Sequence, residues 1–110
     1  MSDAQAEEFW PVYLEYRTEV LKLNDELVEL IKRFADDIDR LTEAQAKSLT
    51  EGSLRIDKER VALKTKYVRR YAKVLSGVQT ARVLQVENKL DAIFLSGMAK
   101  SVPLVSLPGQ

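Results

Sequence analysis

The sequence predicts an all-α protein built as a long antiparallel helical hairpin, with a shorter third helix and an extended C-terminal tail. Apolar residues recur at helical spacing over most of the chain, and three Ser or Thr residues stand where helix N-caps are expected. Two of the three prolines lie within the last ten residues. A chain of 110 residues has room for one domain, residues 1–110, with one modest core.

Helix starts are marked by a repeated pattern in which Ser or Thr is followed three residues later by Gln. In this capping box the hydroxyl accepts a hydrogen bond from the N3 backbone N–H, while the Gln side chain returns to the N-cap N–H. We therefore expect helices over about residues 2–40, 43–74 and 77–97. The pattern occurs at Ser2 and Gln5, at Thr42 and Gln45, and at Ser76 and Gln79.

The first helix has an apolar stripe whose residues alternate steps of four and three until Asp37 interrupts, as in a heptad repeat. A second apolar set runs beside it at steps of seven, so this helix is expected to touch more than one neighbour. Pro11 removes one backbone hydrogen bond and predicts a kink or break near Glu8 to Trp10. The first stripe comprises Phe9, Tyr13, Tyr16, Val20, Leu23, Leu27, Leu30, Phe34 and Leu41, and the second comprises Leu14, Leu21, Val28 and Ala35.

The second helix carries two apolar lines about 140° apart around its axis. They bracket a polar strip that contains Asp57, Arg60 and Lys64. One line is expected to face the core of the hairpin, which leaves the other for the third helix, a second subunit or a client. Gly52 indicates either a flexible point or a close helix crossing. The lines are Leu49, Ile56 and Leu63, and Leu54, Val61, Val68 and Leu75.

The third helix is expected to cap the hairpin through an inner stripe of Val83, Val86, Leu90 and Ile93, with Phe94 beside it. The following segment, residues 101–110, contains Pro103 and Pro108 and is predicted to be extended. An apolar tail of this kind either packs on its own hairpin or dimer mate, or serves as an arm for a partner.

Charge is divided between the two halves of a chain whose net charge is zero. Residues 1–45 hold five Lys or Arg against twelve Asp or Glu, and residues 46–110 hold twelve against five. We expect the acidic first helix to lie along the basic second one, with Glu8 near Lys73, Glu15 near Lys66 and Glu26 near Arg55. The alternative is a basic surface that attracts an acidic partner.

Composition excludes most familiar catalytic and metal sites. The chain has no Cys and no His, so thiolate nucleophiles, disulfides and imidazole-based chemistry are absent, and we expect neither an enzyme nor a cofactor or metal site. No run approaches the roughly 20 apolar residues that span a bilayer, so no membrane insertion is expected. The acids Asp36, Asp37 and Asp39 lack the glycine-bearing loop of a calcium site, and the basic and aromatic run 69–71 is weak support for nucleic-acid binding in a neutral chain.

Two five-residue motifs give the chain a resemblance to a known family. Leu41-Thr42-x-x-Gln45 matches the Leu-Thr-x-x-Gln motif of the Spy/CpxP-like periplasmic proteins, and Leu75-Ser76-x-x-Gln79 matches it with Ser for Thr. The second motif lies in the segment 73–83, which looks like the family's second motif opening its last helix. In architecture the resemblance covers nearly the whole chain, but in sequence only short stretches.

The resemblance implies a bent hairpin that forms a cradle-shaped homodimer in the periplasm, with any signal peptide already removed. Members of the family act as ATP-independent chaperones or restrain an envelope-stress sensor, so unfolded or envelope proteins are the expected partners. A chaperone needs basic groups for long-range attraction and apolar groups for loose contact. The alternative reading of these residues is a solvated basic face and ordinary core. The candidates are Arg55, Arg69, Arg70 and Lys73 for attraction, and Leu54, Val61, Val68 and Tyr71 for contact.

Three functions therefore remain open at the level of sequence. A chaperone-like protein would bind many unfolded chains weakly, a regulator would bind one folded envelope protein tightly, and a structural bundle would bind only itself. The sequence does not name a client, a partner or an inducing stress.

Overall fold

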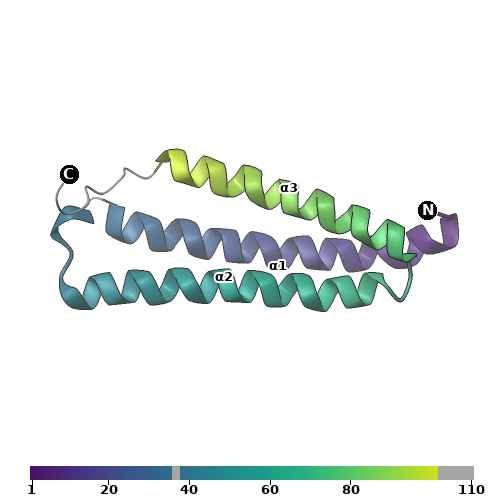
Figure 1. Cartoon of the computed structure of the whole chain (residues 1–110), viewed down its shortest axis with the longest axis horizontal. Coiled ribbons are helices and arrows are strands. Elements are labelled where there is room, and N and C mark those ends of the chain that lie inside the picture. Colours follow the sequence, from purple (N-terminus) through teal and green to yellow (C-terminus); the bar gives the residue numbers. More distant parts are fainter. Residues whose placement is uncertain (36–37, 102–110) are drawn as a thin grey trace.

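The computed structural model describes residues 1–35 and 38–101, and within them the chain forms three α-helices and one short 3₁₀ helix. Helix α1 spans Asp3–Ala35, η1 spans Ile38–Arg40, α2 spans Glu43–Tyr71 and α3 spans Gly77–Ser101. Helices α1 and α2 form a hairpin, and α3 returns beside it, parallel to α1 (Figure 1). The predicted all-α hairpin with a shorter third helix is confirmed, whereas the predicted extended tail lies almost wholly outside the described residues.

All three predicted capping boxes are formed. The backbone N–H of Gln45 donates to Thr42 Oγ1 at 3.1 Å, and the N–H of Thr42 donates to Gln45 Oε1 at 3.0 Å. The same reciprocal pairs join Ser2 to Gln5 and Ser76 to Gln79. Each cap satisfies two N–H groups that the first turn of a helix leaves without a partner, so the local sequence fixes where each helix begins.

Helix α1 runs through Pro11 without a break. Proline removes only the bond to the carbonyl of Glu7, and both residues are exposed, so water can satisfy that carbonyl. The helix ends at Ala35, short of the expected residue 40, and η1 follows it. Helix α2 ends at Tyr71, where the N–H groups of residues 72–75 turn back to the carbonyls of Val68, Arg70 and Tyr71, and α3 continues past Gly97 to Ser101.

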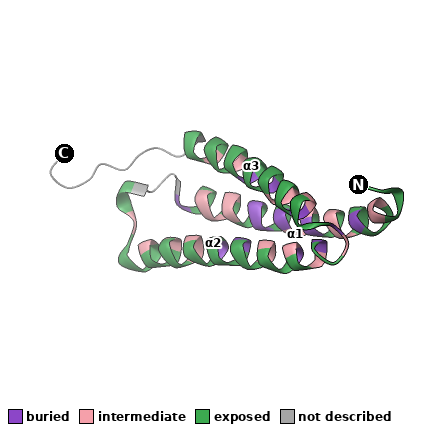
Figure 2. Ribbon diagram, turned by 45° about the vertical axis from the view of Figure 1, so that its right-hand side comes forward, coloured by how far each residue is buried: buried purple, intermediate pink, exposed green. Residues whose placement is uncertain are grey.

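The main core lies at the end of the bundle where α1 begins and α2 ends, and it is largely aromatic. Phe9 and Tyr71 meet edge-on with ring centroids 5.1 Å apart, and Tyr16 and Tyr67 lie 5.3 Å apart. The ribbon segments of buried residues lie mainly where the helices face one another, and those of exposed residues lie mainly on the outside (Figure 2). The buried cluster comprises Phe9, Tyr16, Val20, Tyr67, Tyr71 and Leu75.

Charge complementarity sets the hairpin in register, as the division of charge predicts. Glu26 pairs with Arg55 at 2.8 Å, which confirms one expected contact. Glu15 pairs with Arg70 at 2.6 Å, one turn beyond the expected Lys66. Exposed ion pairs contribute about 1 kcal/mol at most, so these select the register more than they stabilise the fold.

Candidate functional site

The charged strip of α2, rather than its second apolar line, faces α3. Of the first apolar line, Ile56 is buried and Leu49 and Leu63 are half-buried, so this line meets the hairpin core as expected. Arg60 is only 6 % exposed and Lys64 is half-buried, because α3 covers this part of the strip, whereas Asp57 remains exposed. Of the second line, Leu54 and Val61 are exposed and Val68 is half-buried, whereas Leu75 is buried in the main core.

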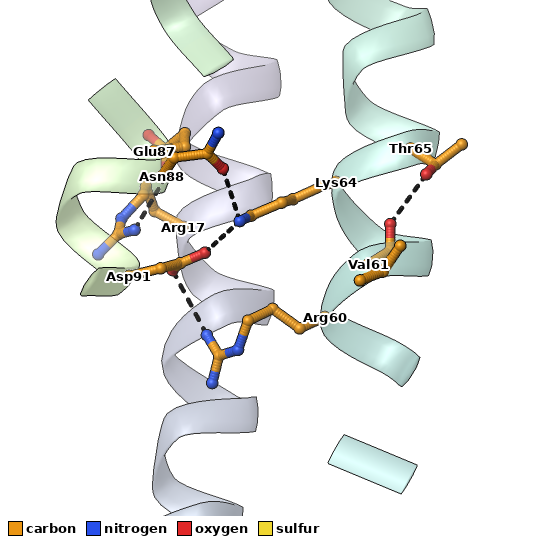
Figure 3. A network of polar contacts seen from close by, with 8 residues as sticks. All are labelled: Arg17, Arg60, Val61, Lys64, Thr65, Glu87, Asn88 and Asp91. Carbon is orange, nitrogen blue, oxygen red and sulfur yellow. Dashed lines mark hydrogen bonds and ion pairs between the residues drawn. The ribbon is translucent and has the colours of Figure 1, made fainter. Parts of the chain in front are cut away.

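A network of buried charges joins α3 to both helices of the hairpin (Figure 3). From α3, Glu87 accepts a hydrogen bond from Arg17 Nη1 of α1 at 3.0 Å. Asp91, one turn further along, pairs with Lys64 at 2.6 Å and with Arg60 at 3.4 Å, both from α2. Both carboxylates are nearly inaccessible, at 2 % and 5 % exposed. We call these five residues the latch.

Several polar atoms around the latch have no hydrogen-bond partner among the protein groups that the structure describes. They are Glu87 Oε1, Arg60 Nε and Nη2, Asn24 Oδ1 and the hydroxyls of Tyr16 and Tyr71. A buried polar atom left unpaired costs about 1–3 kcal/mol unless water reaches it. The guanidinium of Arg60 also lies over the Phe94 ring, 5.8 Å from its centroid, which partly compensates for its burial.

The tyrosines near the latch are held in their neutral form. Burial, followed by the neighbouring Glu87 carboxylate, raises the pKa of Tyr13 to about 12. Burial and then the negative charge of Glu87 raise the pKa of Tyr16 and of Tyr71 well above the usual range. The sequence did not predict that Glu87 would raise the pKa of three tyrosines.

The inner stripe predicted for α3 is wrong for three of its members. Val86, Leu90 and Ile93 are 53 %, 37 % and 61 % exposed, and only Val83 and the neighbouring Phe94 are half-buried. The helix turns the face with Glu87 and Asp91 inward because Arg17, Arg60 and Lys64 supply three cations there. Val86, Leu90 and Ile93, which we call the exposed stripe of α3, therefore face solvent.

Of the candidate contact residues, those on the second line of α2 remain accessible. Leu54 and Val61 are 63 % and 64 % exposed, and Val68 is half-buried. Lys58 and Asp57 each lie one turn from both Leu54 and Val61 and are both exposed, so one basic and one acidic group border the line. Lys47 and Arg69 continue that basic row at intervals of eleven residues, or three turns, and both are exposed.

The other candidates divide into accessible and engaged residues. Arg69 and Lys73 are exposed, but Arg55 and Arg70 are held in ion pairs with acids of α1. Tyr71 is 3 % exposed and packs in the aromatic core, so its prediction as a client contact is wrong. Its position at the end of α2 turns it toward Phe9 and Tyr16.

An apolar groove lies between the start of α1 and α3. Trp10 is half exposed at its edge, and Val83 and Val86 of α3 form the opposite wall. The groove has a volume of about 250 Å³ and is also lined by Met1, Phe9, Tyr13, Arg82 and Glu87. It adjoins the exposed stripe of α3 through Val86.

The remaining sequence features do not assemble into sites. Asp36 and Asp37 lie outside the described residues, and within residues 1–35 and 38–101 no group of three or more Asp, Glu, His or Cys side chains is placed to hold a metal ion. None of the described helices combines the length and apolar character needed to cross a membrane. The basic and aromatic run 69–71 offers no stacking platform, because Tyr71 is buried.

Comparisons with protein-family models, with curated proteins and with solved structures found no match. The candidate site therefore rests on the sequence and structure of this chain alone. Sequence reasoning missed the latch, although one signal pointed to it: Glu87 and Asp91 are the only acids in α3 and stand one helical turn apart.

Proposed function

We propose that this protein is a non-enzymatic, chaperone-like binding protein of the Spy/CpxP type, which holds apolar segments of unfolded chains. The observation that carries the proposal is the exposed apolar line of α2, Leu54 and Val61, bordered by Lys58 and Asp57. An exposed apolar line on a small charged bundle is a surface suited to weak contact with other chains. The basic row of Lys47, Lys58 and Arg69 would attract clients at a distance.

The periplasmic location belongs to the same proposal and rests on the family resemblance alone. Its support is the pair of Leu-Thr/Ser-x-x-Gln motifs at 41–45 and 75–79, both of which form helix caps.

The proposal is tested by measuring whether the purified protein slows aggregation of a chemically denatured client without ATP. We expect suppression that weakens in high salt, because ions screen the basic row. Replacing Leu54 and Val61 by Ser should reduce suppression while leaving helicity and the melting temperature unchanged, since both side chains are exposed. The matched control replaces Ala44 and Ala62, two exposed alanines of α2, by Ser and should leave suppression unchanged.

Two results would reject the chaperone proposal. Absence of suppression at several-fold excess would favour a regulator that docks on one folded envelope protein, or a purely structural bundle. Loss of helicity in the Leu54 and Val61 variant would show that this line is core.

Self-association is a second proposal, carried by the outer face of α1. Leu14 and Leu21 are 63 % and 54 % exposed on the same helix as acidic Glu7 and Asp25. The exposed stripe of α3 lies on the same helix as several basic residues. No acidic residue of α3 is exposed within the part of the helix that the structure describes. These faces are complementary in charge, so we propose a homodimer in which α1 of each subunit meets α3 of the other.

A further inference from the structure

Exposed apolar residues of α1 and α3 border one groove between these two helices. Trp10 and Val86 line opposite walls of the apolar groove described above. At 100° per residue, Leu14 and Leu21 lie within about 40° of Trp10 around α1. Ile93 lies about 20° from Val86 around α3. All five side chains are more than half exposed, so the groove continues as an apolar surface along both helices.

The charges at the edges of this surface are opposite on the two helices. Glu7 and Asp25 flank the apolar row of α1, and Arg82 and Lys100 flank that of α3. All four side chains are exposed, and none forms an ion pair with another residue that the structure describes. Lys32, which follows the α1 row, is already paired with an acid of its own helix at 4.0 Å. The α1 edge is therefore acidic and the α3 edge basic.

Two twofold arrangements set the groove of one copy against that of a second copy with all helices aligned, because α1 and α3 run parallel (Figure 1). An axis perpendicular to the helices places α1 against α1 and α3 against α3, with their directions reversed. An axis parallel to the helices places α1 of each copy against α3 of the other, running in the same direction. The first brings like charges together and the second brings opposite charges together, so charge favours the second.

We propose that the protein forms a homodimer whose twofold axis runs parallel to the helices, so that the two grooves close on each other. The inference rests on the homodimer proposed above and adds to it the orientation and register of the two copies. Rotation about such an axis moves no residue along the helix direction. A residue of α1 therefore meets the part of α3 in the other copy that already lies beside it in its own copy.

Two contacts within one copy fix this register. Arg17 pairs with Glu87, 70 positions later in the chain, and Gln5 bonds to Gln79, 74 positions later. Residues of α1 thus lie beside residues of α3 that follow them by 70–74 positions. In the proposed dimer the same offset relates α1 of one copy to α3 of the other.

This offset matches apolar with apolar residues and acids with bases. Leu14 of one copy faces Val86 of the other, and both are apolar and exposed. Leu21 faces Ile93, seven positions further along both helices. An arginine that faces the indole of a tryptophan can form a cation–π contact. The remaining facing residues are Trp10 with Arg82, and, one helical turn apart, Glu7 with Arg82 and Asp25 with Lys100.

The proposed axis also determines where the dimer would hold clients. Rotation by 180° reverses every direction perpendicular to the axis, so the lines of Leu54 and Val61 in the two copies face opposite ways. They lie on α2, which takes no part in the interface. The dimer would therefore present one client surface on each of two opposite sides.

Cysteine cross-linking tests the register, because the chain has no cysteine of its own. A copy carrying only Leu14→Cys is mixed with a copy carrying only Val86→Cys, so a disulfide between the two positions can form only between copies. This mixture should give about tenfold more covalent heterodimer than Leu14→Cys mixed with Ile93→Cys. In the second mixture the two positions are shifted by about 10 Å along the helices, which is too far for a disulfide.

The reciprocal mixtures provide the matched control. Leu21→Cys should cross-link to Ile93→Cys and not to Val86→Cys. Equal yields from matched and mismatched mixtures would overturn the register. Preferential homodimers of Leu14→Cys would overturn it in favour of α1 against α1.

The unmodified protein gives a check that needs no variant. Its dimer dissociation constant should rise about threefold between about 50 mM and about 500 mM salt, because ions screen the attraction between the opposite edges. A constant that stays unchanged or falls would overturn the arrangement. A monomeric mass would instead reject the dimer itself, whereas a dimeric mass with mismatched cross-links would reject only its register.

Discussion

Tyrosine hydroxyls are the groups most perturbed by burial in this protein. Tyr16 and Tyr71 lie in the aromatic core with no hydrogen-bond partner for either hydroxyl among the described protein groups. The carboxylate of Glu87 adds a negative charge nearby, which further disfavours ionisation. The same environment that disfavours the phenolate makes the folded state sensitive to high pH.

We expect stability to fall as the pH rises above about 10. The pKa of Tyr13, Tyr16 and Tyr71 is raised in the folded state, so the unfolded chain releases these protons first. The stabilisation that the neutral phenols provide is fully present below the pKa of tyrosine in the unfolded chain. It declines as the pH rises above that value. Melting temperatures measured by circular dichroism from pH 8 to pH 12 check this. Tyr16→Phe should show a shallower decline, and an identical decline would contradict the assignment.

At the scale of elements, Gly52 of α2 lies against the Leu30 side chain of α1. A Cβ atom at this position would meet Leu30 Cδ2 at 3.0 Å and Cδ1 at 3.2 Å. Of the two readings left open by the sequence, this contact favours close packing between the helices over a flexible point. The gain in helix propensity from alanine, up to about 1 kcal/mol, competes there with steric crowding.

A double-mutant cycle on Gly52 and Leu30 measures this competition. In the unmodified background, Gly52→Ala should stabilise by much less than about 1 kcal/mol, or destabilise, because the new methyl group displaces Leu30. With Leu30→Ala also present, the same change should recover nearly the whole propensity gain. Urea unfolding followed by circular dichroism gives both values. Equal effects in the two backgrounds would show that the crossing is not tight.

At the scale of the whole molecule, the protein is a rod of 57 × 24 × 17 Å with apolar residues exposed on all three helices. Its charges divide along the chain, with acids concentrated on α1 and bases on α2 and α3. Within one molecule, some of these opposite charges already lie opposite one another on the facing sides of α1 and α2. The outer faces of α1 and α3 retain the rest, which is the basis of the proposed dimer.

Light scattering at micromolar concentration should give twice the monomer mass of 12.5 kDa. Replacing Leu14 and Leu21 by Ser should shift the protein toward monomer while preserving helicity, because both side chains are exposed. The Leu54 and Val61 double variant lies on another face and serves as the control. A monomeric mass for the unmodified protein would reject the dimer.

The sequence by itself determined the elements of this protein. The caps at Ser2, Thr42 and Ser76 act within three residues, and the heptad stripe of α1 selects one face, so helix starts and the packing of the hairpin follow from local pattern. The sequence also grouped Leu54 and Val61 with Val68 and Leu75 on one apolar line, but it left open whether the third helix, a second subunit or a client covers that line. Of the kink or break expected near Pro11, the break is absent, because the Glu7 carbonyl that loses its hydrogen bond belongs to an exposed residue that water can reach.

Only the tertiary structure decided which face of α3 turns inward. Apolar periodicity favours Val86, Leu90 and Ile93, but these residues face solvent while Glu87 and Asp91 are buried. The choice depends on cations contributed by two other helices, far apart in sequence, whose common position exists only after α1 and α2 have packed. Local pattern fixes a helix and its stripes, whereas the burial of a charge depends on where its counter-charge lies in space.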